Sequence, residues 1–107
     1  NWLGLVIACV SPEIIENSIE EVKKLNIPFG YKANLWKVEE PVPVHKFALP
    51  SDEIGANPVQ AMGTRDDYTD TRFLEFSKKM LNKGATILGG CCETKPSHIA
   101  KISILKN

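Results

Sequence analysis

The stretch Ala85-Thr86-Ile87-Leu88-Gly89-Gly90-Cys91-Cys92 joins a short apolar run to two glycines and a pair of adjacent cysteines. The third cysteine of the chain, Cys9, closes a similar apolar run that begins at Leu5. Runs of this kind are typical of parallel strands that are covered on both faces. Because chemistry in parallel β/α proteins is placed at the carboxyl ends of the strands, we expect the three thiols to share one end of a sheet.

Strand signals alternate with helix signals along the whole chain. We expect strands over residues 3–9, 29–34 and 85–89, and helices that begin at Ser11, Thr69 and Pro96. Ser11 and Thr69 are typical N-cap residues, and Gly84 is a typical helix stop. Residues 35–65 show no convincing period and form a long connection of the kind that often covers a site. The order predicts one parallel α/β architecture with right-handed crossovers.

The bulk composition excludes several classes of function. The chain has 107 residues, enough for one small domain, and its 13 basic residues balance its 13 acidic ones. This balance gives no electrostatic argument for nucleic acid or an anionic membrane, and no apolar stretch approaches the roughly 20 residues of a membrane span. An odd number of cysteines, two of them adjacent, argues against a secreted disulfide scaffold. We therefore expect reduced thiols in a cytoplasmic protein that binds neither nucleic acid nor membrane.

Three converging thiolates are the ligand set of a zinc site with one coordination position left open. Gly89 and Gly90 permit the tight backbone turn that two adjacent ligands, Cys91 and Cys92, require. An open, sulfur-rich zinc site suits a thiol substrate, because zinc deprotonates a thiol that coordinates it. Two other interpretations remain: cysteines also pack well at the ends of buried strands, and a strained disulfide can join adjacent cysteines.

The flanking residues resemble a known family. Gly89 to Cys92, followed by Glu93-Thr94-Lys95-Pro96-Ser97-His98-Ile99, is similar to the signature of homocysteine S-methyltransferases, which include betaine–homocysteine methyltransferase. Ser11-Pro12-Glu13 after Cys9, and Tyr31-Lys32-Ala33-Asn34, also resemble that family. Ala8 and Lys95 depart from it, since asparagine and threonine usually stand at those two places.

The resemblance implies a fold, a reaction and a set of residues. The fold is a (β/α)8 TIM barrel, of which residues 1–107 would be the carboxyl-terminal three β/α units, strands six to eight. The reaction is methyl transfer to the thiol of homocysteine, giving methionine, with Zn²⁺ held by Cys9, Cys91 and Cys92. Asn34, at the end of the second expected strand, is predicted to bind substrate. The methyl donor is left open among betaine, S-methylmethionine and a methyl-corrinoid, because enzymes that use each of them share these cysteines.

The chain begins at Asn1, almost directly before a strand, and we expect it to be the carboxyl-terminal part of a longer protein. The first five β/α units of the implied barrel are not among these residues, so we expect little or no catalysis by the isolated chain. We also expect a partner, either the amino-terminal part of the barrel or a second copy. A non-catalytic zinc-binding module derived from the barrel is the alternative function. His98 is predicted to orient or pack rather than to ligate zinc, and His45 to be solvated.

Overall fold

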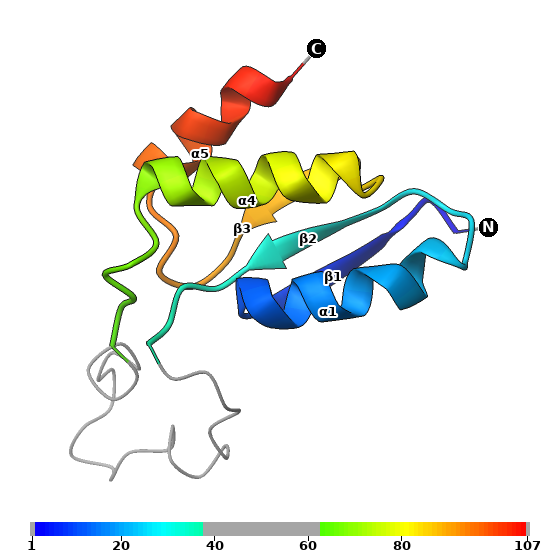
Figure 1. Cartoon of the computed structure of the whole chain (residues 1–107), viewed down its shortest axis with the longest axis horizontal. Helices are drawn as coiled ribbons and strands as arrows, with labels where there is room; N and C mark the ends of the chain where they lie inside the picture. The colour runs from blue at the N-terminus through cyan, green and yellow to red at the C-terminus, as the bar shows by residue number, and fades with distance from the viewer. Residues whose placement is uncertain (1, 38–62, 107) are drawn as a thin grey trace, which may run out of the picture.

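The computed structural model of the chain describes residues 2–37 and 63–106 and shows a small α/β domain (Figure 1). The elements in chain order are β1 (Leu5–Val10), α1 (Pro12–Lys23), β2 (Phe29–Ala33), α4 (Asp70–Asn82), β3 (Ile87–Gly90), α5 (Pro96–Ile102) and a short 3₁₀ helix, η2 (Ser103–Leu105). The three strands form one parallel sheet in the order β1-β2-β3. The predicted α/β class and the alternation of strands and helices are confirmed, with boundaries that differ by one or two residues. His45 lies outside the described residues.

Both long helices begin, and α4 ends, as their sequences predict. The Ser11 hydroxyl accepts a hydrogen bond from the backbone N–H of Ile14 at 3.4 Å, and the Thr69 hydroxyl accepts one from Arg72 at 3.2 Å. These caps satisfy N–H groups that have no partner inside the helix. Gly84 has a φ of +105°, a conformation that ends α4 and that residues with a side chain rarely adopt.

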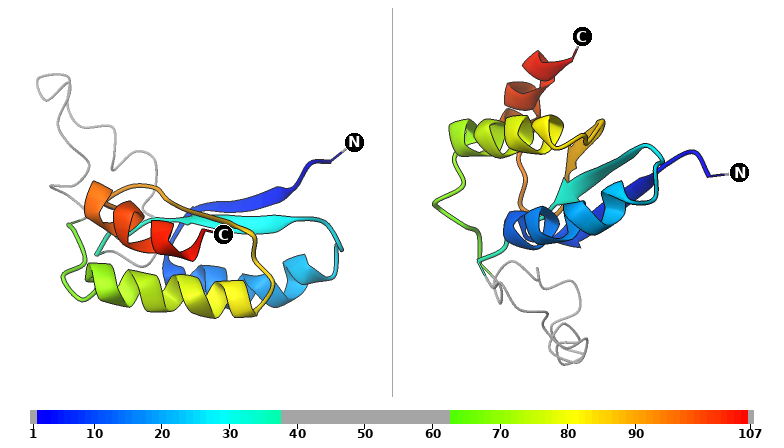
Figure 2. Two further views of the ribbon diagram at one scale, coloured as in Figure 1. Left: turned by 90° about the horizontal axis from the view of Figure 1, so that it is seen from above. Right: turned by 45° about the vertical axis from the view of Figure 1, so that its right-hand side comes forward.

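The helices lie on one side of the sheet, where they build the core (Figure 2). Tyr31, at the centre of β2, is fully buried and donates a hydrogen bond of 2.6 Å to Ser77 of α4. Burial raises the pKa of Tyr31 to about 12. The ring of Tyr31 also meets Phe76 edge-on, with centroids 5.0 Å apart. These contacts attach α4 to the middle strand. The segment before α4 lies at the carboxyl end of the sheet, where Arg65 donates a backbone hydrogen bond to Leu35, and the segment after it lies at the amino end, where Thr86 donates one to Phe29.

The sequence predicted strands that are covered on both faces, but in the described part of the chain the face away from the helices is exposed. Val6 is 39% exposed, Ile87 is 37% exposed, and Ala8 and Lys32 are also exposed. All four side chains alternate with core-facing residues, which places them on the face away from the helices. Among residues 2–37 and 63–106, no helix or strand covers this face, since right-handed crossovers send every described helix to the opposite side. We refer to it below as the open face.

An ion-pair network joins the start of α1 to the segment that leads into α4. Arg65, whose side chain is only 8% exposed, donates two hydrogen bonds of 2.7 Å to Glu13 and two of 2.9–3.0 Å to Asp67. The hydrogen bond from Arg65 lowers the pKa of Glu13 and lowers the pKa of Asp67 to about 2. The Arg65 guanidinium also stacks on Tyr68 at 4.7 Å. The Arg65-Asp66-Asp67 triplet is therefore a structural element of the helix entry.

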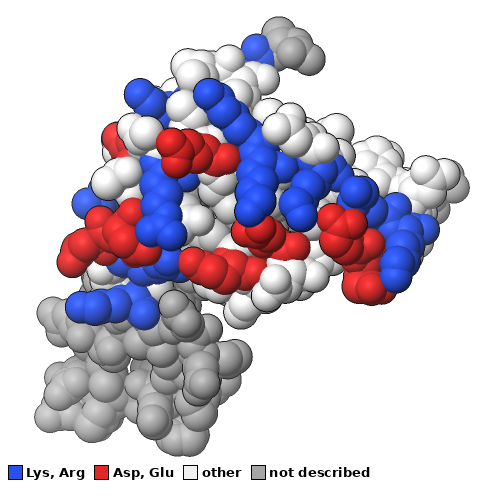
Figure 3. Space-filling model, viewed as in Figure 1, with Lys and Arg blue, Asp and Glu red and all other residues white. Residues whose placement is uncertain are grey.

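Basic and acidic side chains are mixed over the surface drawn in Figure 3, with no large area of one sign on that face. This distribution agrees with the formal net charge of zero. Within the part of the chain that the structure describes, no helix has the length and apolar character needed to cross a membrane.

Gly30 provides a test of this sheet. A Cβ at Gly30 would lie 1.8 Å from the carbonyl oxygen of Ile87, so β2 and β3 can pair here only without a side chain. Gly30→Ala should lower the free energy of unfolding by about 2–4 kcal/mol, measured by thermal or urea denaturation followed by circular dichroism.

Gly89→Ala is the matched control, because a Cβ there would lie 3.6 Å from its nearest neighbours, an ordinary contact. A Gly30→Ala protein as stable as the Gly89→Ala protein would contradict the described pairing of β2 with β3.

Candidate metal centre

Cys9 lies in an irregular part of β1. The pairing of β1 with β2 shifts between Ala8 and Val10, which leaves Cys9 as the extra residue of a β-bulge. Its φ is 58°, in the left-handed region that residues other than glycine rarely enter, and the residue is exposed. The sequence placed Cys9 at the last position of the strand, whereas β1 continues to Val10. The bulge is what turns the thiol of Cys9 out of the strand.

Cys91 and Cys92 directly follow β3, where a tight turn begins. Thr94 closes this turn through its backbone N–H and its hydroxyl, which lie 3.2 Å and 2.6 Å from the carbonyl oxygen of Cys91. Glu93, inside the turn, has a φ of 64°. A Cβ at Gly90 would lie 2.2 Å from the Thr94 hydroxyl, so the turn folds back onto the strand at a place where only glycine fits. The predicted tight geometry around the cysteine pair is present.

The three thiols come together in space, although the strands that carry two of them are separated by β2. All three Sγ atoms lie within 4.8 Å of one another, and the Sγ atoms of Cys91 and Cys92 are 3.9 Å apart. Four ligands at about 2.3 Å around a tetrahedral zinc ion are spaced about 3.8 Å apart. The sulfur set therefore fits a zinc ion in ligand type, and the spacing of Cys91 and Cys92 fits as well, whereas Cys9 and Cys91 lie closer together than two zinc ligands do.

Cys9 and Cys91 are joined as a disulfide in the structure, with Cα atoms 5.8 Å apart, and Cys92 is a free thiol. This pairing differs from the three reduced thiols expected from the sequence, and it also differs from a bond between the adjacent cysteines. A disulfide and a thiolate site use the same two sulfurs, so metal binding requires that Cys9 and Cys91 be reduced.

The carboxyl end of β2 holds both cysteine segments in place. The side-chain amide of Asn34, a residue only 7% exposed, donates a hydrogen bond of 2.8 Å to the carbonyl of Cys9. The backbone N–H of Leu35 donates to the carbonyl of Cys92 at 2.9 Å, and the N–H of Cys91 donates to Ala33 at 2.8 Å. The structure thus brings Asn34 to the cysteine cluster and gives it a positioning contact with Cys9.

His98 is committed to the helix that follows the cysteines. Its Nδ1 accepts a hydrogen bond from the backbone N–H of Lys95 at 2.9 Å, and its Nε2 lies 2.9 Å from the carbonyl of Tyr68. Nε2 must carry the hydrogen in this arrangement, since a carbonyl can only accept. Both ring nitrogens are occupied and the residue is buried, so His98 orients α5, as the sequence indicated, and is not placed as a ligand.

Sequence reasoning missed a contact beside the cysteine turn. The Thr64 hydroxyl donates a hydrogen bond to the carboxylate of Glu93. Trp36 and Thr64 form an antiparallel bridge, which pairs the two ends of the long connection next to this turn. In the sequence, the only local signal was a charged residue, Glu93, directly after the cysteine pair. That signal does not identify a hydrogen-bond partner 29 residues away.

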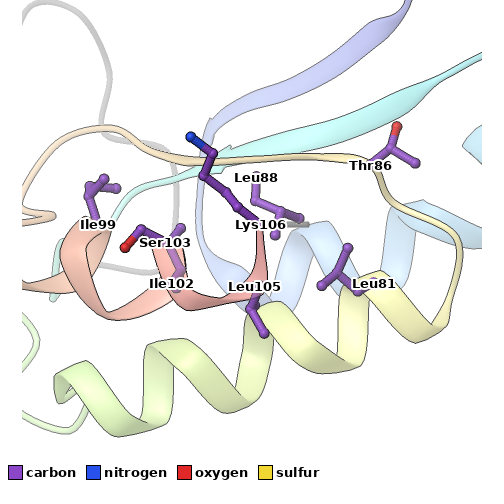
Figure 4. Close-up of a pocket in the computed structure, with 8 residues that line it drawn as sticks. All are labelled: Leu81, Thr86, Leu88, Ile99, Ile102, Ser103, Leu105 and Lys106. Atoms are coloured by element: carbon purple, nitrogen blue, oxygen red, sulfur yellow. The ribbon is translucent and has the colours of Figure 1, made fainter.

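A cavity of about 430 Å³ lies elsewhere, between α4, β3 and α5 (Figure 4). Its lining is mainly aliphatic and includes Leu81, Leu88 and Ile102, and it contains no cysteine, histidine or carboxylate. The residue types needed for metal or thiol chemistry are at the cysteine cluster, which we therefore take as the candidate functional site.

Comparison with known proteins agrees with the family that the residues around the cysteines resemble. The family model described as homocysteine S-methyltransferase matches residues 1–105. The chain is 30% identical to homocysteine S-methyltransferase 1 of Arabidopsis thaliana, in an alignment that covers 96% of this chain and 27% of that protein. The chain thus spans about a quarter of the length of this curated relative. No solved structure matches the chain.

Asn34→Ala tests the positioning of Cys9. The change leaves the Cys9 carbonyl without its donor, so we expect a loss of about 1–2 kcal/mol in the free energy of unfolding and a roughly tenfold weaker affinity for zinc. Denaturation and competition with a zinc chelator measure the two effects. Asn82→Ala, at the end of α4, is the control and should change neither quantity. Equal zinc affinity in the two variants would remove Asn34 from the site.

Proposed function

Because the chain belongs to the homocysteine S-methyltransferase family, we propose that it carries the metal-binding part of a zinc-dependent methyltransferase. The reaction moves a methyl group from an activated donor to the sulfur of homocysteine, which loses its thiol proton and becomes the thioether of methionine. The observation that supports this proposal most directly is the meeting of three sulfurs, from two strands that are not neighbours, within 4.8 Å at the carboxyl end of the sheet.

Cys9, Cys91 and Cys92 are the proposed zinc ligands. Three thiolates leave the fourth position of the ion open for a substrate sulfur. When bound, the ion supplies the acidity that converts a coordinating thiol into a thiolate, whereas a free thiol with a pKa near 8.5 is mostly protonated at neutral pH. The chain's own contribution is to hold the three sulfurs in place through the bulge at Cys9 and the turn at Cys91, and to leave access from the open face.

Asn34 remains a proposed contact for homocysteine as well as a support for Cys9. One hydrogen of its amide nitrogen is used by the Cys9 carbonyl, and its Oδ1 accepts from the N–H of Trp36 at 3.4 Å. The second amide hydrogen is the group that would contact the substrate.

We further propose that β1, β2 and β3 are the last three strands, six to eight, of a (β/α)8 barrel domain that includes residues 1–107. The parallel pairing, the right-handed crossovers and the helices on a single side support this assignment. The outer edges of β1 and β3 would pair with further strands, from the same polypeptide or from a second one. Because the proposed ligands must be reduced thiols, the proposed location is the cytosol.

Zinc content tests the ligand assignment. The reduced protein should bind one equivalent of zinc, and Cys91→Ser should lower the bound zinc to well under half an equivalent, because one of only three protein ligands is lost. Atomic emission or mass spectrometry after gel filtration measures the metal. His98→Asn is the control and should retain zinc, since neither nitrogen of His98 is available to the ion. Unchanged zinc in the Cys91→Ser protein would remove Cys91 from the ligand set.

Methionine formation tests the reaction. The full-length zinc-loaded protein is supplied with homocysteine and, in turn, with betaine, S-methylmethionine or a methyl-corrinoid. We expect methionine from one of these donors, and a rate at least about thirtyfold lower for Cys91→Ser, because an unactivated thiol is only a few per cent ionised at neutral pH. Zinc binding without methionine from any donor would instead support a non-catalytic zinc-binding module.

A further inference from the structure

Lys32 lies on the open face, in the row of the sheet directly below the cysteine cluster. It is paired across the sheet with Ala8 of β1 and with Gly89 of β3, two residues with little or no side chain. Lys32 is exposed, and a Cβ built at Gly89 would lie 3.6 Å from its Cγ. The lysine stem therefore lies beside Gly89 on the open face.

Cys91 follows Gly89 by two residues on the same chain segment, so strand alternation places its side chain on the face that carries Lys32. The backbone N–H of Cys91 still donates to Ala33 of β2 at 2.8 Å, which shows that the pairing of the two segments extends to this residue. The rise along a strand and the spacing between strands put the Cα atoms of Lys32 and Cys91 about 8 Å apart. A lysine side chain spans most of this distance.

The charge of Lys32 is not used elsewhere in the described part of the chain. Lys32 makes no hydrogen bond or ion pair with residues 2–37 or 63–106, unlike Lys24, Lys79 and Lys83, which pair with glutamates of α1. The charges at the cluster are negative. Three thiolates around a divalent ion leave a net charge of −1, a substrate thiolate makes it −2, and Glu93 follows Cys92 directly.

We propose that Lys32 is a charge-compensating residue of the sulfur cluster. A divalent metal replaces the protons of three thiols that are mostly neutral when free, so metal binding takes the cluster from neutral to a net charge of −1. The ammonium group of Lys32 offsets this negative charge and so raises the affinity of the site for the metal. Lys32 acts through the cysteines and is a positioning residue of the site rather than a ligand. The inference rests on the proposed metal site and adds to it a residue that supplies no ligand atom.

The test compares zinc affinity among variants of residue 32 in the reduced full-length protein. Lys32→Met keeps the aliphatic stem and removes the charge, and for two unit charges about 8 Å apart at an effective dielectric constant near 20 this should weaken zinc binding about thirtyfold. Lys32→Glu should weaken it further, and Lys32→Arg should restore it to within about threefold of the wild type. Competition with a chelator measures the dissociation constants. Lys78→Met, on the helix side of the sheet, is the matched control and should leave the affinity unchanged.

Two further readouts separate a charge effect from a loss of structure. The absorption bands of the Co²⁺-substituted protein, which report thiolate ligation, should keep their position and intensity in Lys32→Met at saturating metal. This difference in affinity should also shrink at high salt, because screening weakens a charge effect and does not repair a packing defect. Thermal unfolding confirms that each variant is folded.

The outcomes distinguish this inference from the function on which it rests. Zinc bound equally by the wild type, Lys32→Met and Lys32→Glu overturns the role of Lys32 and leaves the metal site intact. A lower affinity in Lys32→Met that Lys32→Arg does not restore also overturns it, since packing would then be the cause. A wild-type protein that binds neither zinc nor Co²⁺ when reduced overturns the metal site and the role of Lys32 together.

Discussion

The candidate site depends on the carboxyl end of β2, which binds both cysteine segments at once. Asn34 holds the carbonyl of Cys9 on one side, while Leu35 and Ala33 hydrogen-bond to Cys92 and Cys91 on the other. Cys9 and Cys91 are 82 residues apart in sequence, and among the described strands β2 is the one that pairs with both β1 and β3. Local preferences place each cysteine at the end of a strand, but the hydrogen bonds of β2 bring the sulfurs within reach of one ion. Changes at Gly30 or Asn34 should therefore affect the site although neither residue carries a sulfur.

The parts of the fold that follow local rules could be predicted from the sequence. Ser11 and Thr69 cap helices because their hydroxyl groups accept hydrogen bonds from the first turn, and Gly84 ends one because it tolerates a left-handed conformation. The positions of the cysteines directly after apolar runs predicted the cluster, because parallel strands place their carboxyl ends together. These signals are contained in a few consecutive residues.

The features that could not be predicted depend on contacts between distant residues. A left-handed φ at Cys9 has no signature in the sequence, because the strain is tolerated only where the surrounding sheet fixes it. The contact between Thr64 and Glu93 joins a loop to a turn, and neither residue belongs to a pattern that indicates the other. The strand ends shifted for a related reason: the bulge extends β1 to Val10, and the pairing of β3 with β2 begins only at Ile87.

The backbone of the cysteine segments is held by hydrogen bonds to β2 and does not depend on contacts at the open face. The core lies between the sheet and its helices. In the structure Cys9 and Cys91 are joined to each other, and the backbone hydrogen bonds at the end of β2 hold both cysteine segments. The role proposed for Lys32 depends on its neighbours Ala8 and Gly89, which have little or no side chain and so leave room on the open face for a cation beside the sulfurs.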